Sequence, residues 1–196
     1  MIKKEKIKSL SEKYLPEVIS IRRHIHANPE LSFKEYNTSE FVASKLREYG
    51  VAFENKIVKT GIVATIEGGS PPAPPEGGRV PAHRNSARKV IALRAELDAL
   101  PIVEDNNVEY KSKNDGVMHA CGHDVHAASL LGVAKILSEL KEEFEGTVKL
   151  IFQPGEEKLP GGASLMIAEG VFGPGWQVPD KTKYRALSTK SAVGSR

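Results

Sequence analysis

The sequence Val90-Ile91-Ala92-Leu93-Arg94-Ala95-Glu96-Leu97-Asp98 begins as an uninterrupted apolar run and ends in charged residues. A short apolar run of this kind predicts a strand that is covered on both faces of a sheet. In open α/β sheets, ligand chemistry lies in the crevice beyond the carboxyl ends of the strands. Asp98, which follows the predicted strand, is therefore a candidate functional residue.

A second strand is predicted at residues 147–152, and it leads into the polar segment Gln153-Pro154-Gly155-Glu156-Glu157. Apolar residues at helical spacing predict one helix over residues 124–140 and another over residues 162–169. The order strand, helix, strand, helix indicates an α/β fold with a mostly parallel sheet and helices on both faces. Both polar strand ends then lie at the same edge of the sheet.

The segment before these strands is predicted to contain two helices and three short strands. The first helix covers residues 11–28, where Pro16 is tolerable only in the first turn. The second ends at Gly50, and Ser32 and Glu35 have the spacing of a capping box at its start. The β-branched runs that predict strands are residues 51–53, 57–58 and 61–66.

Proline and glycine dominate residues 68–89. Proline donates no hydrogen bond to a sheet, and the segment offers little apolar surface to bury. We interpret it as a mobile loop between two strands and not as a domain boundary. A proline-rich ligand for an SH3-like groove is the alternative.

The composition is that of a globular domain, because 40% of the 196 residues are hydrophobic and 27% are charged. No apolar run is long enough to span a membrane, and the first residues lead to no signal-peptide core. We therefore expect a cytoplasmic protein without a membrane partner. The formal net charge of +3 owes much to an atypical basic tail at residues 173–196. Aromatic residues do not alternate with these charges, so we expect no nucleic-acid partner.

The segment His119-Ala120-Cys121-Gly122-His123-Asp124-Val125-His126 contains three histidines, the only cysteine of the chain and a carboxylate. Thiolate and imidazole are preferred ligands of zinc and similar divalent ions. Alone, a histidine near a helix start is usually a capping or solvated residue, and a lone cysteine is usually a small buried hydrophobe. Together, Cys121 and His123 favour a metal site.

The neighbours of this pair are less specific candidates. Asp124 precedes an apolar helical run and is predicted to be its N-cap. His119, Asp124 and His126 are candidates for contacts behind the metal ligands or with a substrate. An ordinary structural role is open for His119 and for His126.

Glu156 and Glu157 are adjacent carboxylates at a predicted strand end. Two such charges repel each other unless a cation or a shared proton relieves the repulsion. Metal binding by Glu157 and proton transfer by Glu156 would resolve the conflict, because Glu156 could take a proton from water and pass it to a leaving nitrogen. A solvated surface is the usual setting of such a pair, and its position after a buried strand favours the functional interpretation.

Four segments resemble, in family order, the amidohydrolase branch of the aminoacylase and carboxypeptidase metallopeptidases. They are HIHANPELSF at residues 24–33, ALRAELDALP at 92–101, MHACGHD at 118–124 and FQPGEE at 152–157. The branch includes hippurate hydrolases, N-acetyldiaminopimelate deacetylases and auxin-conjugate hydrolases. The resemblance covers roughly residues 12–172 and implies a zinc-peptidase-like fold that hydrolyses the amide bond of an N-acyl amino acid or small peptide.

The resemblance also implies roles for individual residues. Cys121 and His123 match the first two metal ligands, and Glu157 matches the next one. Glu156 matches the general base, and Asp98 matches a carboxylate that supports a ligand from behind. The cofactor would be a divalent metal, with two ions in a complete site. Zinc is the leading candidate, and manganese and cobalt are the alternatives.

The chain also departs from the family. Its members are about twice as long, so residues 1–172 correspond to the N-terminal part of a catalytic domain without the inserted dimerisation domain of a homo-oligomeric family. The chain reads FGPGWQVPD at residues 172–180, where the family has a Gly-Leu-His segment with another ligand, and no histidine follows His126. We therefore expect a truncated form with weak metal binding and low or no activity by itself.

Two other functions are compatible with the sequence. The chain could be a non-catalytic metal-binding or interaction module that retains the family core. It could also be a thiol hydrolase in which Cys121 is the nucleophile and a nearby histidine is the base. The sequence supplies no residue to orient that base.

Overall fold

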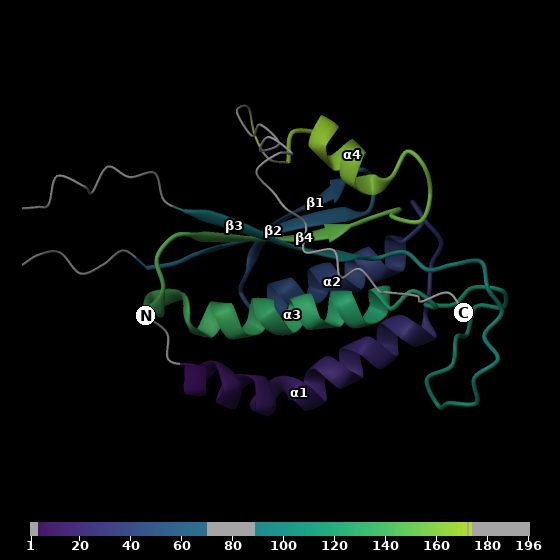
Figure 1. The fold of residues 1–196 in the computed structure, drawn as a ribbon, viewed down its shortest axis with the longest axis horizontal. Helices are drawn as coiled ribbons and strands as arrows, with labels where there is room; N and C mark the ends of the chain where they lie inside the picture. The colour runs from purple at the N-terminus through teal and green to yellow at the C-terminus, as the bar shows by residue number, and fades with distance from the viewer. Residues whose placement is uncertain (1–3, 70–88, 172, 174–196) are drawn as a thin grey trace, which may run out of the picture.

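The computed structural model describes residues 4–69, 89–171 and 173, and the fold is shown in Figure 1. Within these ranges the chain forms one sheet with helices packed on it. The elements are α1 (Lys4–Ala27), α2 (Tyr36–Glu48), β1 (Ala52–Ile57), β2 (Gly61–Glu67), β3 (Val90–Glu96), α3 (His123–Glu139), the short 3-10 helix η2 (Lys141–Glu143), β4 (Thr147–Gln153) and α4 (Gly162–Ala168).

The sheet has the strand order β1-β2-β4-β3. Strands β1 and β2 pair antiparallel, as do β2 and β4, whereas β3 and β4 are parallel. The predicted α/β class is confirmed. The described sheet is mixed and not mostly parallel, because β1 and β2 form a hairpin and β2 pairs with β4. The parallel pair is the part of the sheet that carries the candidate site.

Helices cover both faces of the sheet, as predicted (Figure 1). Helices α2 and α3 pack on one face, α4 packs on the other, and α1 lies against α3. Burial of their apolar sides forms the main core, which supplies most of the favourable free energy of folding. Its largest fully buried members include Ile25, Leu46, Ile62, Leu131 and Phe152.

The prediction that residues 90–93 are covered on both faces is wrong. Strand β3 forms, but it lies at the edge of the described sheet, and residues 90–94 are exposed. Ile91 is 60% exposed and Val90 is 47% exposed. The described part of the chain therefore leaves several apolar side chains of this strand exposed.

Helix α1 begins at Lys4, well before the predicted start, and Pro16 lies in its interior. The expectation that Pro16 belongs to the first turn is therefore wrong. Proline cannot donate the backbone hydrogen bond of a helix interior, which costs about 3 kcal/mol. Burial of Tyr14, Ile21 and Ile25 on one side of the helix provides packing free energy that offsets this cost.

The capping box predicted at Ser32 and Glu35 does not form. Helix α2 begins at Tyr36, and its N-cap residue is Glu35. The side chain of Glu35 makes no capping hydrogen bond to the backbone of the helix. Glu30 caps the helix instead, because its carboxylate accepts hydrogen bonds from the free backbone N–H groups of Asn37 and Thr38 in the first turn. Ser32 and Glu35 are free to make bonds elsewhere.

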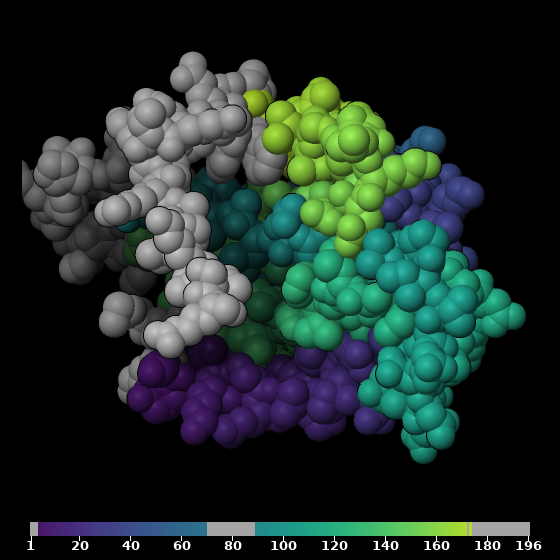
Figure 2. Space-filling view, turned by 45° about the vertical axis from the view of Figure 1, so that its right-hand side comes forward, coloured from purple at the N-terminus to yellow at the C-terminus, as the bar shows by residue number. Residues whose placement is uncertain are grey.

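The predicted loop at residues 68–89 and the predicted tail at 173–196 lie almost entirely outside the described residues. In the described ranges, no helix has both the length and the apolar character needed to cross a membrane. The segment between β3 and α3 forms a lobe beside the C-terminal end of α1 (Figures 1 and 2). It contacts α1 directly, because the N–H of Lys113 donates to the carbonyl oxygen of Ala27.

Candidate metal centre

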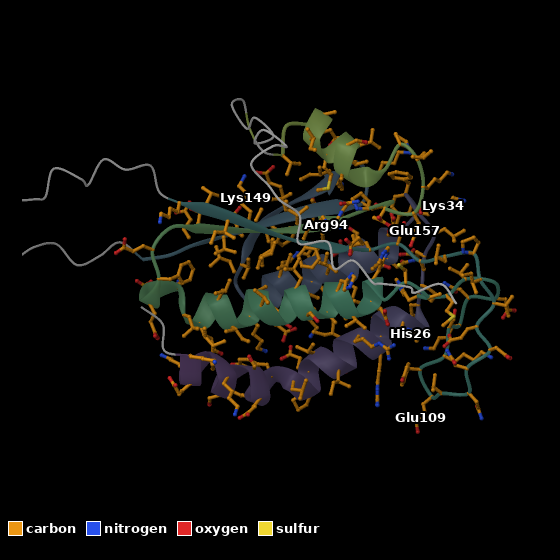
Figure 3. All side chains as sticks on the ribbon, viewed as in Figure 1. His26, Lys34, Arg94, Glu109, Lys149 and Glu157 are labelled. Atoms are coloured by element: carbon orange, nitrogen blue, oxygen red, sulfur yellow. The ribbon has the colours of Figure 1, made fainter. Side chains whose placement is uncertain are left out.

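The turns that follow β3 and β4 lie side by side. The two strands are parallel, with Glu96 in register with Gln153, so their carboxyl ends meet at the same edge of the sheet. The N–H of Leu97 extends this pairing by donating to the carbonyl oxygen of Gln153. Asp98 and Glu157 are thus brought to one site, and Figure 3 shows Glu157 at this end of the sheet.

The start of α3 contributes two further side chains. Gly122 has a φ of +87° and precedes the first residue of the helix, His123. A Cβ atom at Gly122 would meet nothing within 4 Å, so the glycine is needed for its backbone conformation and not for space. This turn directs Cys121 and His123 to the same side. Asp124 is therefore inside the helix, and its predicted role as N-cap is wrong.

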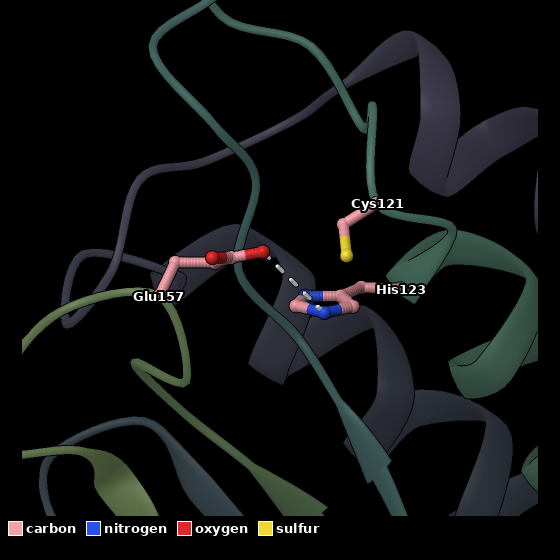
Figure 4. Close-up of side chains that lie close together, drawn as sticks. All are labelled: Cys121, His123 and Glu157. Carbon is pink, nitrogen blue, oxygen red and sulfur yellow. Dashed lines mark ion pairs between the residues drawn. The ribbon is translucent and has the colours of Figure 1, made fainter. Parts of the chain in front are cut away.

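The turn after β4 and the start of α3 bring three ligand types together (Figure 4). One ligand atom from each of Cys121, His123 and Glu157 lies within 4.8 Å of the others. An oxygen of Glu157 is 3.9 Å from Nε2 of His123, and an oxygen of Glu156 is at the same distance from that nitrogen. Both adjacent carboxylates therefore face the same imidazole.

The orientation of His123 is fixed by Asp98. Nδ1 of His123 lies 2.8 Å from the backbone carbonyl oxygen of Asp98, which can only accept, so Nδ1 carries the hydrogen and donates it. This bond leaves Nε2 facing the cluster. Burial disfavours a charge on His123, but the side chain and backbone of Asp98 outweigh it and raise the pKa to about 9.

The carboxylate of Asp98 also fixes the turn that follows β4. Its Oδ2 accepts hydrogen bonds from Oγ of Ser32 at 2.6 Å and from the N–H of Glu157 at 3.0 Å. Burial alone would raise its pKa, but these bonds and the neighbouring His123 lower the pKa to about 2. Asp98 is therefore an anion that contacts both the imidazole and the carboxylate turn.

The electrostatics of the cluster favour a cation. Cys121 is exposed, and its pKa is raised because the thiol bonds Glu157 and lies in the negative field of Glu156 and Glu96. A thiolate beside these carboxylates would need a positive charge to stabilise it. Thiolate, imidazole and carboxylate are the donor types of zinc sites. The buried Oδ1 of Asp98 lies 3.3 Å from Nδ1 of His123, so this carboxylate adds a further negative charge beside the cluster. The residues present therefore fit a divalent ion.

The other two histidines of the segment have different surroundings. His119 is buried, and neither ring nitrogen has a hydrogen-bond partner among the described residues. Burial lowers its pKa to about 4, so the ring is neutral near pH 7. The side chain of His126 is half exposed, and its Nδ1 lies 2.8 Å from an oxygen of Glu96. Neither histidine belongs to the three-residue cluster.

A buried charge network behind the cluster escaped the sequence analysis. The two ring nitrogens of His26 lie 2.8 Å from an oxygen of Asp124 and 3.0 Å from an oxygen of Glu104. Nε of Arg22 forms an ion pair with the same oxygen of Asp124 at 2.7 Å. The network ties α1 and the lobe after β3 to the first turn of α3. The sequence feature that could have revealed this network is the segment HIHANPELSF, which contains His26. The family resemblance of that segment implied no role for its histidines.

Comparisons with known proteins identify relatives of the chain. Residues 92–185 match the model of peptidase family M20/M25/M40. An N-acyl-L-amino acid amidohydrolase of Geobacillus stearothermophilus is 45% identical over 169 residues, which are 86% of this chain and 41% of the relative. A hippurate hydrolase of Campylobacter jejuni is 47% identical over 152 residues, which are 78% of this chain and 35% of the relative.

A solved structure gives the same result for the fold. The YXEP protein of Bacillus subtilis, a dinuclear metal-binding peptidase, superimposes with a TM-score of 0.70 and 38% sequence identity. The match covers 82% of this chain and 40% of that structure. The chain thus spans about 40% of the length of the relatives that it matches, and the resemblance inferred from the four sequence segments is confirmed.

Proposed function

Since this chain belongs to peptidase family M20/M25/M40, we propose that it supplies the metal-binding half of an amidohydrolase active site. The reaction is hydrolysis of the amide bond of N-acyl amino acids or small peptide conjugates. The domain concerned is residues 1–172. The convergence of Cys121, His123 and Glu157 at the end of the parallel strand pair is the observation that carries this proposal.

These three residues would hold a divalent metal ion, with zinc as the leading candidate. When bound, the ion would supply a Lewis acid that polarises the substrate carbonyl and stabilises negative charge. Asp98 would keep His123 in the orientation that exposes Nε2, because a carbonyl or carboxylate behind a ligand histidine fixes its tautomer.

Glu156 would move the proton. Its carboxylate is 39% exposed and faces the cluster beside Glu157, so water and substrate can reach it. It would take a proton from the attacking water and deliver it to the nitrogen of the leaving amine. A carboxylate in this position would act as base and then as acid in one turnover, so its loss should greatly lower hydrolysis without abolishing metal binding.

The test is hydrolysis of N-acetyl amino acids and hippurate by the 196-residue chain loaded with zinc. We expect activity that a chelator removes and that Glu156→Gln lowers by at least about 100-fold, the usual scale for loss of a general base. Glu142→Gln, an exposed glutamate remote from the cluster, is the control. Activity that survives the chelator would contradict the proposal.

We further propose that turnover by this chain alone is slow. Among the described residues, only three side chains form a cluster that could hold a metal, and a family site with two ions needs more ligands. Turnover at a rate typical of enzymes, about 10 per second, by the purified 196-residue chain would contradict this.

A non-catalytic metal-binding module is the second candidate, and the three-ligand cluster is the observation that favours it. Calorimetric titration with zinc separates the two proposals, because binding without hydrolysis of any N-acyl amino acid supports the module. The thiol hydrolase is disfavoured. The pKa of Cys121 is raised by neighbouring carboxylates, whereas an activated cysteine has a lowered pKa.

A further inference from the structure

Glu35 is a fully buried carboxylate that the proposed reaction does not use. It precedes α2 and lies far in sequence from the turn that carries Glu156 and Glu157. Buried carboxylates are costly unless hydrogen bonds satisfy their oxygens. The partners of Glu35 therefore show what its burial achieves.

Three hydrogen bonds converge on the two oxygens of Glu35. Oε1 accepts the backbone N–H of Gly155 at 2.8 Å and that of Phe33 at 2.9 Å. Oε2 accepts the hydroxyl of Thr60, itself buried, at 2.7 Å. One side chain thus joins the segment before α2, the turn between β1 and β2, and the turn after β4.

The bond to Gly155 reaches the carboxylate turn next to its functional residues. Gly155 has a φ of +54°, and a Cβ atom there would lie 2.4 Å from the ring of Phe33. Phe33 itself has a positive φ of 62°, a conformation that is strained for a bulky residue. The bond from its N–H to Glu35 stabilises this conformation, and the ring then packs over Gly155.

We propose that Glu35 is a positioning residue that fixes the turn 154–157 and thereby holds the carboxylates of Glu156 and Glu157 at the three-residue cluster. It acts together with Asp98, whose Oδ2 accepts the N–H of Glu157 in the same turn. The turn is therefore held at two backbone N–H groups by two buried carboxylates. The consequence for metal binding rests on the proposed function, whereas the consequence for the conformation of the turn does not.

Substitutions of Glu35 can separate the effect of its side-chain length from the effect of its negative charge. In Glu35→Gln, the amide oxygen can accept the N–H groups of Phe33 and Gly155, and the amide nitrogen can donate to the hydroxyl of Thr60. Glu35→Asp keeps the charge but is one methylene shorter, so it cannot span these partners. We call the three hydrogen bonds from Gly155, Phe33 and Thr60 to Glu35 the clamp. We expect Glu35→Gln to preserve the clamp and Glu35→Asp to break it. Glu35→Ala removes it entirely.

The experiment measures two properties of the full 196-residue chain and its variants. Amide hydrogen exchange at Gly155 without metal reports the clamp, and titration with Co²⁺ reports the cluster through the cobalt–thiolate absorption of Cys121. We expect faster exchange at Gly155 and about 10- to 100-fold weaker Co²⁺ binding in Glu35→Asp and Glu35→Ala, the scale known for residues that support metal ligands. Glu35→Gln should resemble the unsubstituted chain.

Glu30→Ala is the matched control. It removes a carboxylate from the same segment that bonds only the start of α2, through Asn37 and Thr38. Its Co²⁺ affinity and Gly155 exchange should stay unchanged. Equal exchange and equal affinity in Glu35→Asp and the unsubstituted chain would overturn the inference. If the unsubstituted chain binds no Co²⁺, the proposed function fails, but hydrogen exchange at Gly155 still tests whether Glu35 fixes the turn. If Glu35→Ala does not fold, the Glu35→Gln and Glu35→Asp variants provide the test.

Discussion

The carboxylate of Asp98 accepts the backbone N–H of Glu157 at 3.0 Å, which joins the end of β3 to the turn that follows β4. The same residue holds the imidazole of His123 through its backbone carbonyl oxygen. Two of the three candidate ligands therefore depend on one residue. Asp98 is central to the site although its carboxylate is not part of the three-residue cluster.

Replacement of Asp98 should weaken metal binding more than it weakens the fold. Asp98→Asn removes the negative charge and, if its amide oxygen keeps the bonds from Ser32 and Glu157, turns its NH2 group toward the N–H at Nδ1 of His123. We therefore expect about 10- to 100-fold lower zinc affinity. Competition with a chromophoric zinc chelator measures this. Asp105→Asn, an exposed carboxylate in the lobe after β3, is the control. Unchanged zinc affinity in Asp98→Asn would show that Asp98 does not organise the ligands.

Loss of the imidazole of His26 should destabilise the fold. His26→Leu leaves two buried carboxylates, Asp124 and Glu104, without the ring that lies between them. Removing one partner of a buried ionic network costs about 3–5 kcal/mol. Urea unfolding of the metal-free protein measures the change in the free energy of unfolding.

An exposed ion pair provides the comparison for His26. Lys13 and Glu139 are 60% and 40% exposed, and Lys13→Ala should cost less than about 1 kcal/mol because water screens the pair. Equal losses of unfolding free energy in His26→Leu and Lys13→Ala would contradict the importance of the buried network.

The ionisation of Glu35 should make stability depend on pH in a defined direction. Burial raises its pKa, although bonds from Thr60, Gly155 and Phe33 oppose this. A carboxyl group with a raised folded-state pKa contributes stability that is fully present below its unfolded pKa and is lost as the pH rises through the folded value. Glu35→Gln cannot ionise, so its unfolding free energy relative to the unsubstituted chain should rise from acid to neutral pH.

Denaturant unfolding of both proteins across that pH range gives the difference directly, because all other titrating groups are shared. A relative stability of Glu35→Gln that falls with rising pH would mean that the folded state lowers the pKa of Glu35. Such a result would contradict the expectation that ionisation of Glu35 destabilises the folded state.

The exposed edge strand β3 should promote self-association. Unpaired strand edges with apolar side chains recruit other chains, and a charge on the edge suppresses this. Ile91→Lys should therefore lower concentration-dependent association in sedimentation velocity, while the unfolding free energy changes by about 0.5 kcal/mol or less. Leu159→Lys replaces an apolar residue that is more exposed, at 91%, but lies away from this edge, and it should have no such effect. The same association in both variants would contradict a role for β3.

Local patterns predicted several elements well. Helix α3, strand β4 and helix α4 lie within one or two residues of their predicted ranges, because each has a clear periodicity or apolar run. The ligand candidates Cys121 and His123 share one short segment, so their proximity follows from the chain itself. Glu157 joins them because parallel strands end at the same edge of a sheet.

Long-range contacts explain what the sequence could not predict. The exposure of β3 depends on the order of strands in the sheet, which a local apolar run does not encode. Asp124 was predicted as an N-cap, but its partner His26 is 98 residues away. Glu35 was assigned to a capping box, whereas its partner Gly155 is 120 residues away. Such residues fit a local sequence pattern, but their hydrogen-bond partners lie far away in the sequence.

X-ray absorption at the zinc edge of the zinc-loaded 196-residue chain tests the central claim most directly, because it reports the atoms bound to the metal. We predict one sulfur ligand at about 2.3 Å together with nitrogen and oxygen ligands, and loss of the sulfur contribution in Cys121→Ser. Glu157→Gln should keep the sulfur ligand but bind zinc more weakly. A zinc ion without sulfur coordination in the unsubstituted chain would contradict a metal centre built on Cys121, His123 and Glu157.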